Sequence, residues 1–230
     1  MNLKKNPPVP AFTLIEIMVA IALFSIIVAA IYSTWTLVMR SSQVGLAVAA
    51  RTQRARVAVR TIETSLTCIQ SFQASPQYYS FVVQNGDPSL LSFTARLPDS
   101  FPRSGRYINP VTGKDFPVRQ LIYSVESGPN SEKDLVLRQT PILMEMDPDE
   151  RGTPLVLARN VKNFVVECLD TNQGKWVTEW KDTNSIPPQV RYNLVLGGND
   201  DAHGAALTSG ITNIVTIPSV MLPTFLQKPR

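Results

Sequence analysis

Near its N-terminus the chain has a long apolar segment, and an amphipathic segment follows it. Between Ile17 and Met39 lie 23 residues without a charge, and a transmembrane helix needs roughly 20 apolar residues. Farther on, apolar residues recur at spacings near three, four and seven, which indicates a helix with one face packed on its own domain. That face comprises Val44, Val48, Ala55, Val59, Ile62, Leu66 and Ile69. Because no proline interrupts this stretch, we expect a single helix from Phe12 to Ile69.

Beyond Pro76 the pattern changes to short segments of alternating apolar and polar residues, which are typical of strands. Turn residues such as Asn85-Gly86-Asp87-Pro88 and Asn172-Gln173-Gly174 separate them. The candidate strands are residues 79–83, 90–97, 120–127, 134–140, 155–170, 175–180, 190–197 and 211–219. A long N-terminal helix followed by antiparallel strands predicts an α+β fold.

One charge, Glu16, lies near the start of the apolar segment. A cleaved secretory signal would have a shorter apolar core of about 7–15 residues, although Val28-Ala29-Ala30 could mimic its cleavage site. A plain signal anchor accounts for the length of the segment but not for Glu16 or for the three prolines just upstream. A third interpretation comes from the residues around the acid.

The stretch AFTLIEIMVAIALFSIIVAAIY, residues 11–32, resembles the N-terminal signature of type IV pilins and type II secretion pseudopilins. The resemblance implies that residues 1–11 are a leader, which a prepilin peptidase removes between Ala11 and Phe12 before Phe12 is N-methylated. Glu16 then takes the fifth mature position, where the family keeps its glutamate. One departure is Ala11, because the family normally has glycine before the cut, and we expect slower processing.

Elementary chemistry gives Glu16 a partner after such a cut. A carboxylate inside a membrane is costly and normally has a partner. The new α-amine of Phe12 is positively charged near neutral pH, and residues i and i+4 share one face of a helix. Glu16 could therefore pair with the amine of its own chain or of a neighbouring chain, which would set the register of an assembly. The alternative is that Glu16 lies among the lipid headgroups and is simply hydrated.

A second stretch, residues 155–196, resembles the minor pseudopilins of the J type in type II secretion systems. The similarity lies in an apolar strand ending at Leu169, then Asp170, then Trp176 with Trp180, and then Ile186-Pro187-Pro188-Gln189-Val190 before a last strand. The resemblance implies a non-enzymatic subunit that joins I-, K- and X-type partners and the major pseudopilin at the tip of a pseudopilus. The two cysteines and the tail from Gly197 to Arg230 depart from the J pattern.

The layout that follows has four parts: a leader at 1–11, a transmembrane or filament-core helix at 12–39, its amphipathic continuation at 40–72 and a β-rich domain at 73–230. Lys4 and Lys5 favour a cytoplasmic N-terminus, whereas Arg40 and Arg51 argue for the opposite orientation. The family resemblance decides between them. It implies a single pass through the inner membrane with the C-terminal domain in the periplasm.

The composition offers little else. A net charge of +4, from 22 Lys and Arg against 18 Asp and Glu, is too small to indicate nucleic acid. His203 is the only histidine, which excludes a His-based metal cluster and makes a Ser-His-Asp triad a poor candidate. The sequence has no phosphate-binding glycine loop either. We expect no catalytic residues, metal site, cofactor or small-molecule substrate. Two acidic patches, Glu145 to Glu150 and Asn199-Asp200-Asp201, match no known calcium loop.

Two open questions concern the cysteines and the cellular system. In an oxidising periplasm, Cys68 and Cys168 could form a disulfide or remain two separate thiols. The N-terminal signature serves pili as well as secretion, so the alternative function is a minor pilin of a type IV pilus or DNA-uptake system. A membrane-anchored periplasmic enzyme or binding protein is the rival from another class, and the residue inventory gives it little support.

Overall fold

The computed structural model describes residues 13–72, 75–102, 107, 113, 115–128, 132–142, 144–145, 148–180, 185–197 and 209–218. The chain divides into two compact units, Met1–Thr52 and Gln53–Arg230. The boundary between them falls inside one helix, α1 (Leu14–Thr67), which has 54 residues. The predicted helix is therefore confirmed, with its end two residues earlier than expected.

In the first unit, α1 consists mainly of exposed apolar side chains. Its most apolar window has a mean hydropathy of 2.8 and no buried residue, so the helix is long and apolar enough to cross a membrane. The hydroxyl groups in this segment are bonded within the helix: Ser25 Oγ donates to the Ile21 carbonyl at 2.8 Å, and Thr34 Oγ1 donates to the Ala30 carbonyl at 2.9 Å. These bonds remove the need for water beside the hydroxyls.

In the second unit, one face of α1 is buried in the core. Ala55, Ala58, Ile62 and Leu66 are almost completely buried, and their spacing of three and four residues places them on one face. The predicted stripe is correct here but wrong farther back, because Val44 is 62% exposed and Val48 46% exposed. Both valines belong to the first unit, where the described residues provide no sheet to cover them.

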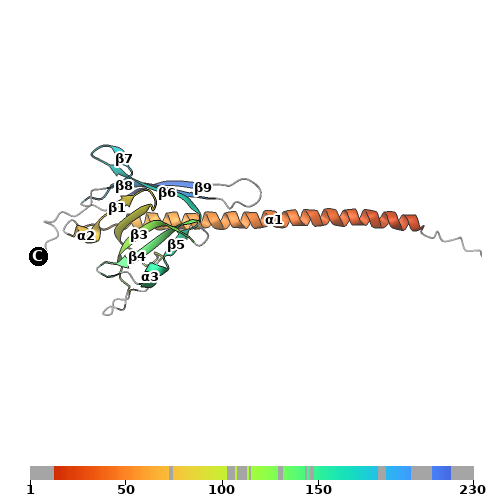
Figure 1. Ribbon diagram of the computed structural model, residues 1–230, viewed down its shortest axis with the longest axis horizontal. Helices are drawn as coiled ribbons and strands as arrows, with labels where there is room; N and C mark the ends of the chain where they lie inside the picture. Colours follow the sequence, from red (N-terminus) through yellow and green to blue (C-terminus); the bar gives the residue numbers. More distant parts are fainter. Residues whose placement is uncertain are drawn as a thin grey trace, which may run out of the picture. The chain divides into compact units, whose positions relative to one another are not determined.

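Two antiparallel sheets make up the rest of the second unit (Figure 1). The first sheet has the order β1-β2-β3-β4-β5, a meander in which each strand pairs with the next along the chain. Its strands are β1 (Val82–Gln84), β2 (Leu90–Arg96), β3 (Val118–Ser127), β4 (Lys133–Pro141) and β5 (Leu155–Ala158). Short helices α2 (Pro76–Tyr79) and α3 (Pro148–Gly152) join it. We did not predict these helices.

The second sheet has the order β7-β6-β8-β9. Its strands are β6 (Val161–Asp170), β7 (Lys175–Val177), β8 (Gln189–Leu196) and β9 (Ser209–Thr216). The predicted strand at 155–170 is in fact two strands, β5 and β6, which belong to different sheets. The break lies at Asn160, whose φ of 54° is left-handed, a conformation that asparagine tolerates better than most residues.

The end of α1 lies between the two sheets (Figure 1). Two buried tyrosines, one from each sheet, bond to it. From the first sheet, Tyr123 Oη shares a hydrogen bond of 2.7 Å with Ser65 Oγ. From the second, Tyr192 Oη donates to the Val59 carbonyl at 3.4 Å. Burial raises the pKa of both phenols well above the ordinary value, so both stay protonated and remain donors at neutral pH.

Asn85 joins the edge of the first sheet to the second. Its Nδ2 donates to the carbonyls of Val166 at 2.7 Å and Thr178 at 2.5 Å, and its Oδ1 accepts the Val166 N–H at 2.8 Å. An isolated bridge between Val83 and Trp180 lies beside it. Asn85 thus satisfies both backbone groups of Val166 just beyond the point where β7 stops pairing with β6.

We predict that Asn85→Ala lowers the free energy of unfolding by about 1–3 kcal/mol, because the backbone groups of Val166 lose their partners. The measurement is thermal or urea unfolding of the detergent-solubilised chain, followed by circular dichroism. The matched control is Asn163→Ala on β6, whose side chain is exposed. Equal stability of the two variants would contradict the role given to Asn85.

Candidate functional site

The start of α1 is closed by a reciprocal pair of side chains. Thr13 precedes the first helical residue, and Glu16 lies in the first turn. Glu16 Oε2 accepts hydrogen bonds from the Thr13 N–H at 3.0 Å and from Thr13 Oγ1 at 3.1 Å, while the Glu16 N–H donates to Thr13 Oγ1 at 3.4 Å. This arrangement is a capping box, in which two residues satisfy each other's unpaired N–H groups. In the single chain, Glu16 therefore has a partner within its own helix.

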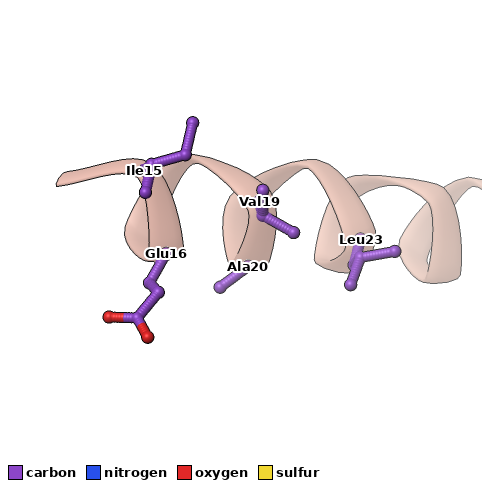
Figure 2. Close-up of a pocket in the computed structure, with 5 residues that line it drawn as sticks. All are labelled: Ile15, Glu16, Val19, Ala20 and Leu23. Carbon is purple, nitrogen blue, oxygen red and sulfur yellow. The ribbon is translucent and has the colours of Figure 1, made fainter. Parts of the chain in front are cut away.

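Figure 2 shows, as sticks, the five residues that line a hollow at this carboxylate: Ile15, Glu16, Val19, Ala20 and Leu23. The hollow has a volume of about 300 Å³. The Glu16 side chain projects from the helix, and Ala20 lies one turn farther on the same side. Because alanine has the smallest side chain of any chiral residue, a neighbouring group can approach the carboxylate closely on this side.

The two parts of the expected processing site, Ala11 and Phe12, lie outside the described residues. The structure therefore places Glu16 but does not bring it together with an α-amine. Sequence analysis missed the role of Thr13. The signal was present, because Thr13-Leu14-Ile15-Glu16 has the Thr-x-x-Glu spacing of a capping box.

Both cysteines are free thiols in the structure. Cys68 follows the end of α1 and is half-buried, whereas Cys168 on β6 is completely buried. Burial raises the pKa of the Cys168 thiol to about 12, so this sulfur stays protonated and unreactive at neutral pH. The choice between a disulfide and two separate thiols stays a prediction for the labelling experiment described below.

Among the described residues, the acidic patches do not form a cluster that could bind a metal ion. Glu145 is described, and residues 148–152 form α3, but residues 146–147, Asn199-Asp200-Asp201 and His203 lie outside the described residues. Within the part of the chain that the structure describes, no group of three or more His, Cys, Asp and Glu residues could hold a metal ion.

The two tryptophans of the 155–196 stretch occupy different environments. Trp180 lies at the junction of the sheets, where its Nε1 donates to the Ser185 carbonyl at 3.0 Å. It also lines a polar hollow of about 430 Å³ with Asp170 and Glu179. Trp176, on β7, is half-buried under the guanidinium of Arg191, whose Cζ lies 4.5 Å from the centre of the indole ring system.

Arg191 also forms an ion pair with the residue directly opposite it. Arg191 on β8 pairs in register with Glu167 on β6, and Arg191 Nε donates to Glu167 Oε2 at 2.6 Å. This bond raises the pKa of Arg191, so the guanidinium is always charged. Sequence analysis did not identify this pair, because the two residues are 24 positions apart in sequence and only strand register joins them.

Comparison with known proteins first identifies the class of this chain. Residues 11–32 match the prokaryotic N-terminal methylation motif. A pilin-like α+β protein typically combines such a motif with a long apolar helix and antiparallel sheets, and this chain has all three. The predicted fold class and the predicted pilin-like N-terminus are confirmed.

A full-length relative then indicates the particular type. The chain is 26% identical over 205 residues to the type II secretion system protein J of Xanthomonas campestris pv. campestris, and the match covers 84% of this chain and 90% of the relative. The predicted resemblance to J-type pseudopilins is therefore confirmed, and it extends well beyond residues 155–196. Both findings are similarities to pilin-like and pseudopilin proteins, and within the described residues α1 is long and apolar enough to cross a membrane.

We predict that both thiols react with a maleimide under denaturing, non-reducing conditions, and that only Cys68 reacts in the folded chain. The reason is burial, because Cys168 is completely covered and its thiol stays protonated. Mass spectrometry of the labelled chain measures both outcomes, with Cys68→Ser as the control that removes native-state labelling. Absence of reactive thiols after denaturation would instead demonstrate a disulfide.

Proposed function

We propose that this chain is a minor pseudopilin of a type II secretion system, a structural subunit that acts by assembly at the tip of the pseudopilus. The observation that carries the proposal is the match to a type II secretion protein J over 84% of the chain, together with the methylation motif at residues 11–32. The inferred partners are I-, K- and X-type subunits and the major pseudopilin.

The proposal includes maturation and location. A prepilin peptidase removes residues 1–11, Phe12 becomes the N-methylated first residue, and residues 12–39 anchor the chain in the inner membrane. The β-rich domain then lies in the periplasm. The long apolar part of α1 supports this arrangement, because its side chains are exposed and need lipid or other helices around them.

Glu16 acts during assembly by changing its partner. In the single chain, the carboxylate accepts two hydrogen bonds from Thr13. An α-amine offers a full positive charge, and a charge-assisted hydrogen bond is roughly twice as strong as a neutral one. A neighbouring chain's N-terminus can therefore replace the contacts with Thr13, and the small side chain of Ala20 leaves room for it.

The function is tested by deleting the gene in its own host and measuring secreted proteins in the medium. We expect secretion to stop and the wild-type gene to restore it. Loss of pilus-dependent motility or of DNA uptake, with secretion intact, would favour the alternative of a minor pilin.

We predict that Glu16→Gln does not restore secretion, although the variant inserts into the membrane at normal levels. Glutamine retains the capping geometry through its amide oxygen but lacks the charge that attracts an amine. Thr13→Ala is the matched variant, because it removes the capping hydroxyl and leaves the carboxylate. The measurements are secretion and co-purification with the other subunits. If Glu16→Gln assembles normally, capping is the whole role of Glu16 and the charge pairing is wrong.

We predict that replacing Ala11 by leucine blocks removal of the leader, because the peptidase normally receives the smallest residue before the cut. Intact-mass measurement of the membrane-extracted chain should show the mature wild type starting at N-methylated Phe12 and the Ala11→Leu variant unprocessed. Ala11→Gly is the control and should be processed at least as fast as the wild type. A wild-type chain that starts elsewhere would refute the assigned cut.

A further inference from the structure

One surface of the second sheet has a composition that the proposed function does not use. Along β8 every second residue is buried, and Arg191 belongs to the outward set. Glu167 on β6, Trp176 on β7 and Ile214 on β9 lie beside it, since Arg191 pairs in register with both Glu167 and Ile214. We refer to Glu167, Trp176, Arg191 and Ile214 together as the Arg191 face.

The guanidinium of Arg191 is held in place, but only part of its hydrogen-bonding capacity is used by the described residues. It has five N–H donors, and among the described residues only Nε has an acceptor, the Glu167 carboxylate. The guanidinium carbon Cζ lies over the Trp176 ring, 4.5 Å from its centre. Within the described residues, its two terminal nitrogens have no acceptor, and 32% of the side chain is exposed. The result is a rigid fork of donors that faces solvent.

Arg138 is a useful comparison, because its side chain has a purely structural role. Arg138 on β4 forms hydrogen bonds from Nε and Nη2 to both oxygens of Glu126, and its Nη1 donates to the Arg151 carbonyl. All three of its nitrogens are therefore in use, and its side chain is only 18% exposed. Arg138 ties α3 to the first sheet, whereas the terminal nitrogens of Arg191 tie no two described elements together.

Stability alone does not explain the Arg191 arrangement. A partly exposed ion pair contributes only about 0–1 kcal/mol. Next to the guanidinium, Ile214 is 51% exposed on its strand, which adds no stability to the single chain. Tryptophan and arginine are, by contrast, the residues that most often dominate binding energy at protein interfaces. The composition is that of a binding surface.

The chemistry of the Arg191 face selects one kind of partner. A planar fork of N–H donors matches the two oxygens of a carboxylate. The nearby Glu167 carboxylate disfavours a doubly charged phosphate, and the apolar side chains of Trp176 and Ile214 favour a partner that has carbon groups beside its acid. An acidic segment of a protein meets these conditions.

We propose that the Arg191 face docks an acidic segment of a neighbouring pseudopilin-type subunit, with one carboxylate bound by the two terminal nitrogens of Arg191. Apolar groups on either side of that carboxylate pack against Trp176 and Ile214. This inference deepens the proposed function and rests on it, because it assumes that the chain assembles with other subunits.

The test places a photo-crosslinking amino acid at position 214 of the full-length chain, expressed in its own host without the wild-type copy. We expect a crosslinked adduct with another pseudopilin-type subunit, whose crosslinked peptide contains Asp or Glu. The same residue placed at Val156, which is 42% exposed on β5, is the positional control and should give at most a fifth of the adduct.

Variants then test the fork itself. Arg191→Gln should reduce the adduct at least fivefold, and Arg191→Lys should also reduce it, because lysine retains the charge but has no planar fork. The control is Arg96→Gln, an exposed arginine on β2 of the other sheet, which should leave the adduct unchanged. Reversing both charges, with Arg191→Glu here and arginine at the mapped acid of the partner, should restore the adduct.

The outcomes separate this inference from the proposed function. If the chain restores secretion in the deletion strain but position 214 gives no adduct, or an adduct only with lipid or a second copy, the docking site is wrong and the function stands. If Arg191→Gln and Arg96→Gln give equal adducts, the carboxylate contact is wrong. If the wild-type chain does not restore secretion, the proposed function itself fails.

Discussion

The burial of one face of α1 between two sheets is the constraint on which the second unit depends. Ala55 and Ala58 have small side chains, so the helix can approach the strands closely, and Ile62 and Leu66 fill the core beyond them. Tyr123 and Tyr192 then tie the helix to one sheet each. Because a helix and a one-sided sheet must each cover an apolar face, the three elements stabilise one another, and the second unit includes the last turns of α1.

The apolar side chains of α1 have different surroundings in the two units. In the second unit its apolar face is covered by strands, whereas in the first unit its apolar side chains are exposed and call for lipid or other helices. The capping box at Thr13 and Glu16 satisfies backbone groups at the start of the helix within the single chain.

The outward face of the second sheet has a different role from its inward face. Inward residues such as Phe164 and Leu194 fill the core. The outward Arg191 and Trp176 form a charged surface, where the terminal nitrogens of Arg191 have no acceptor among the described residues. The two tryptophans of one short stretch therefore serve different purposes. Trp180 helps to join the sheets, and Trp176 orients an arginine.

Periodicity and local motifs were sufficient to predict the long helix, most of the strands and the α+β class. These features depend on residues close together in sequence, because a helical face repeats within four positions and a strand within two. Only the tertiary structure decided four other features. These are the split of residues 155–170 into strands of two sheets, the exposure of Val44 and Val48, the bonds of Asn85 and the pairing of Glu167 with Arg191. Each depends on which segments distant in sequence become neighbours, and a linear pattern of apolar and polar residues does not contain that information.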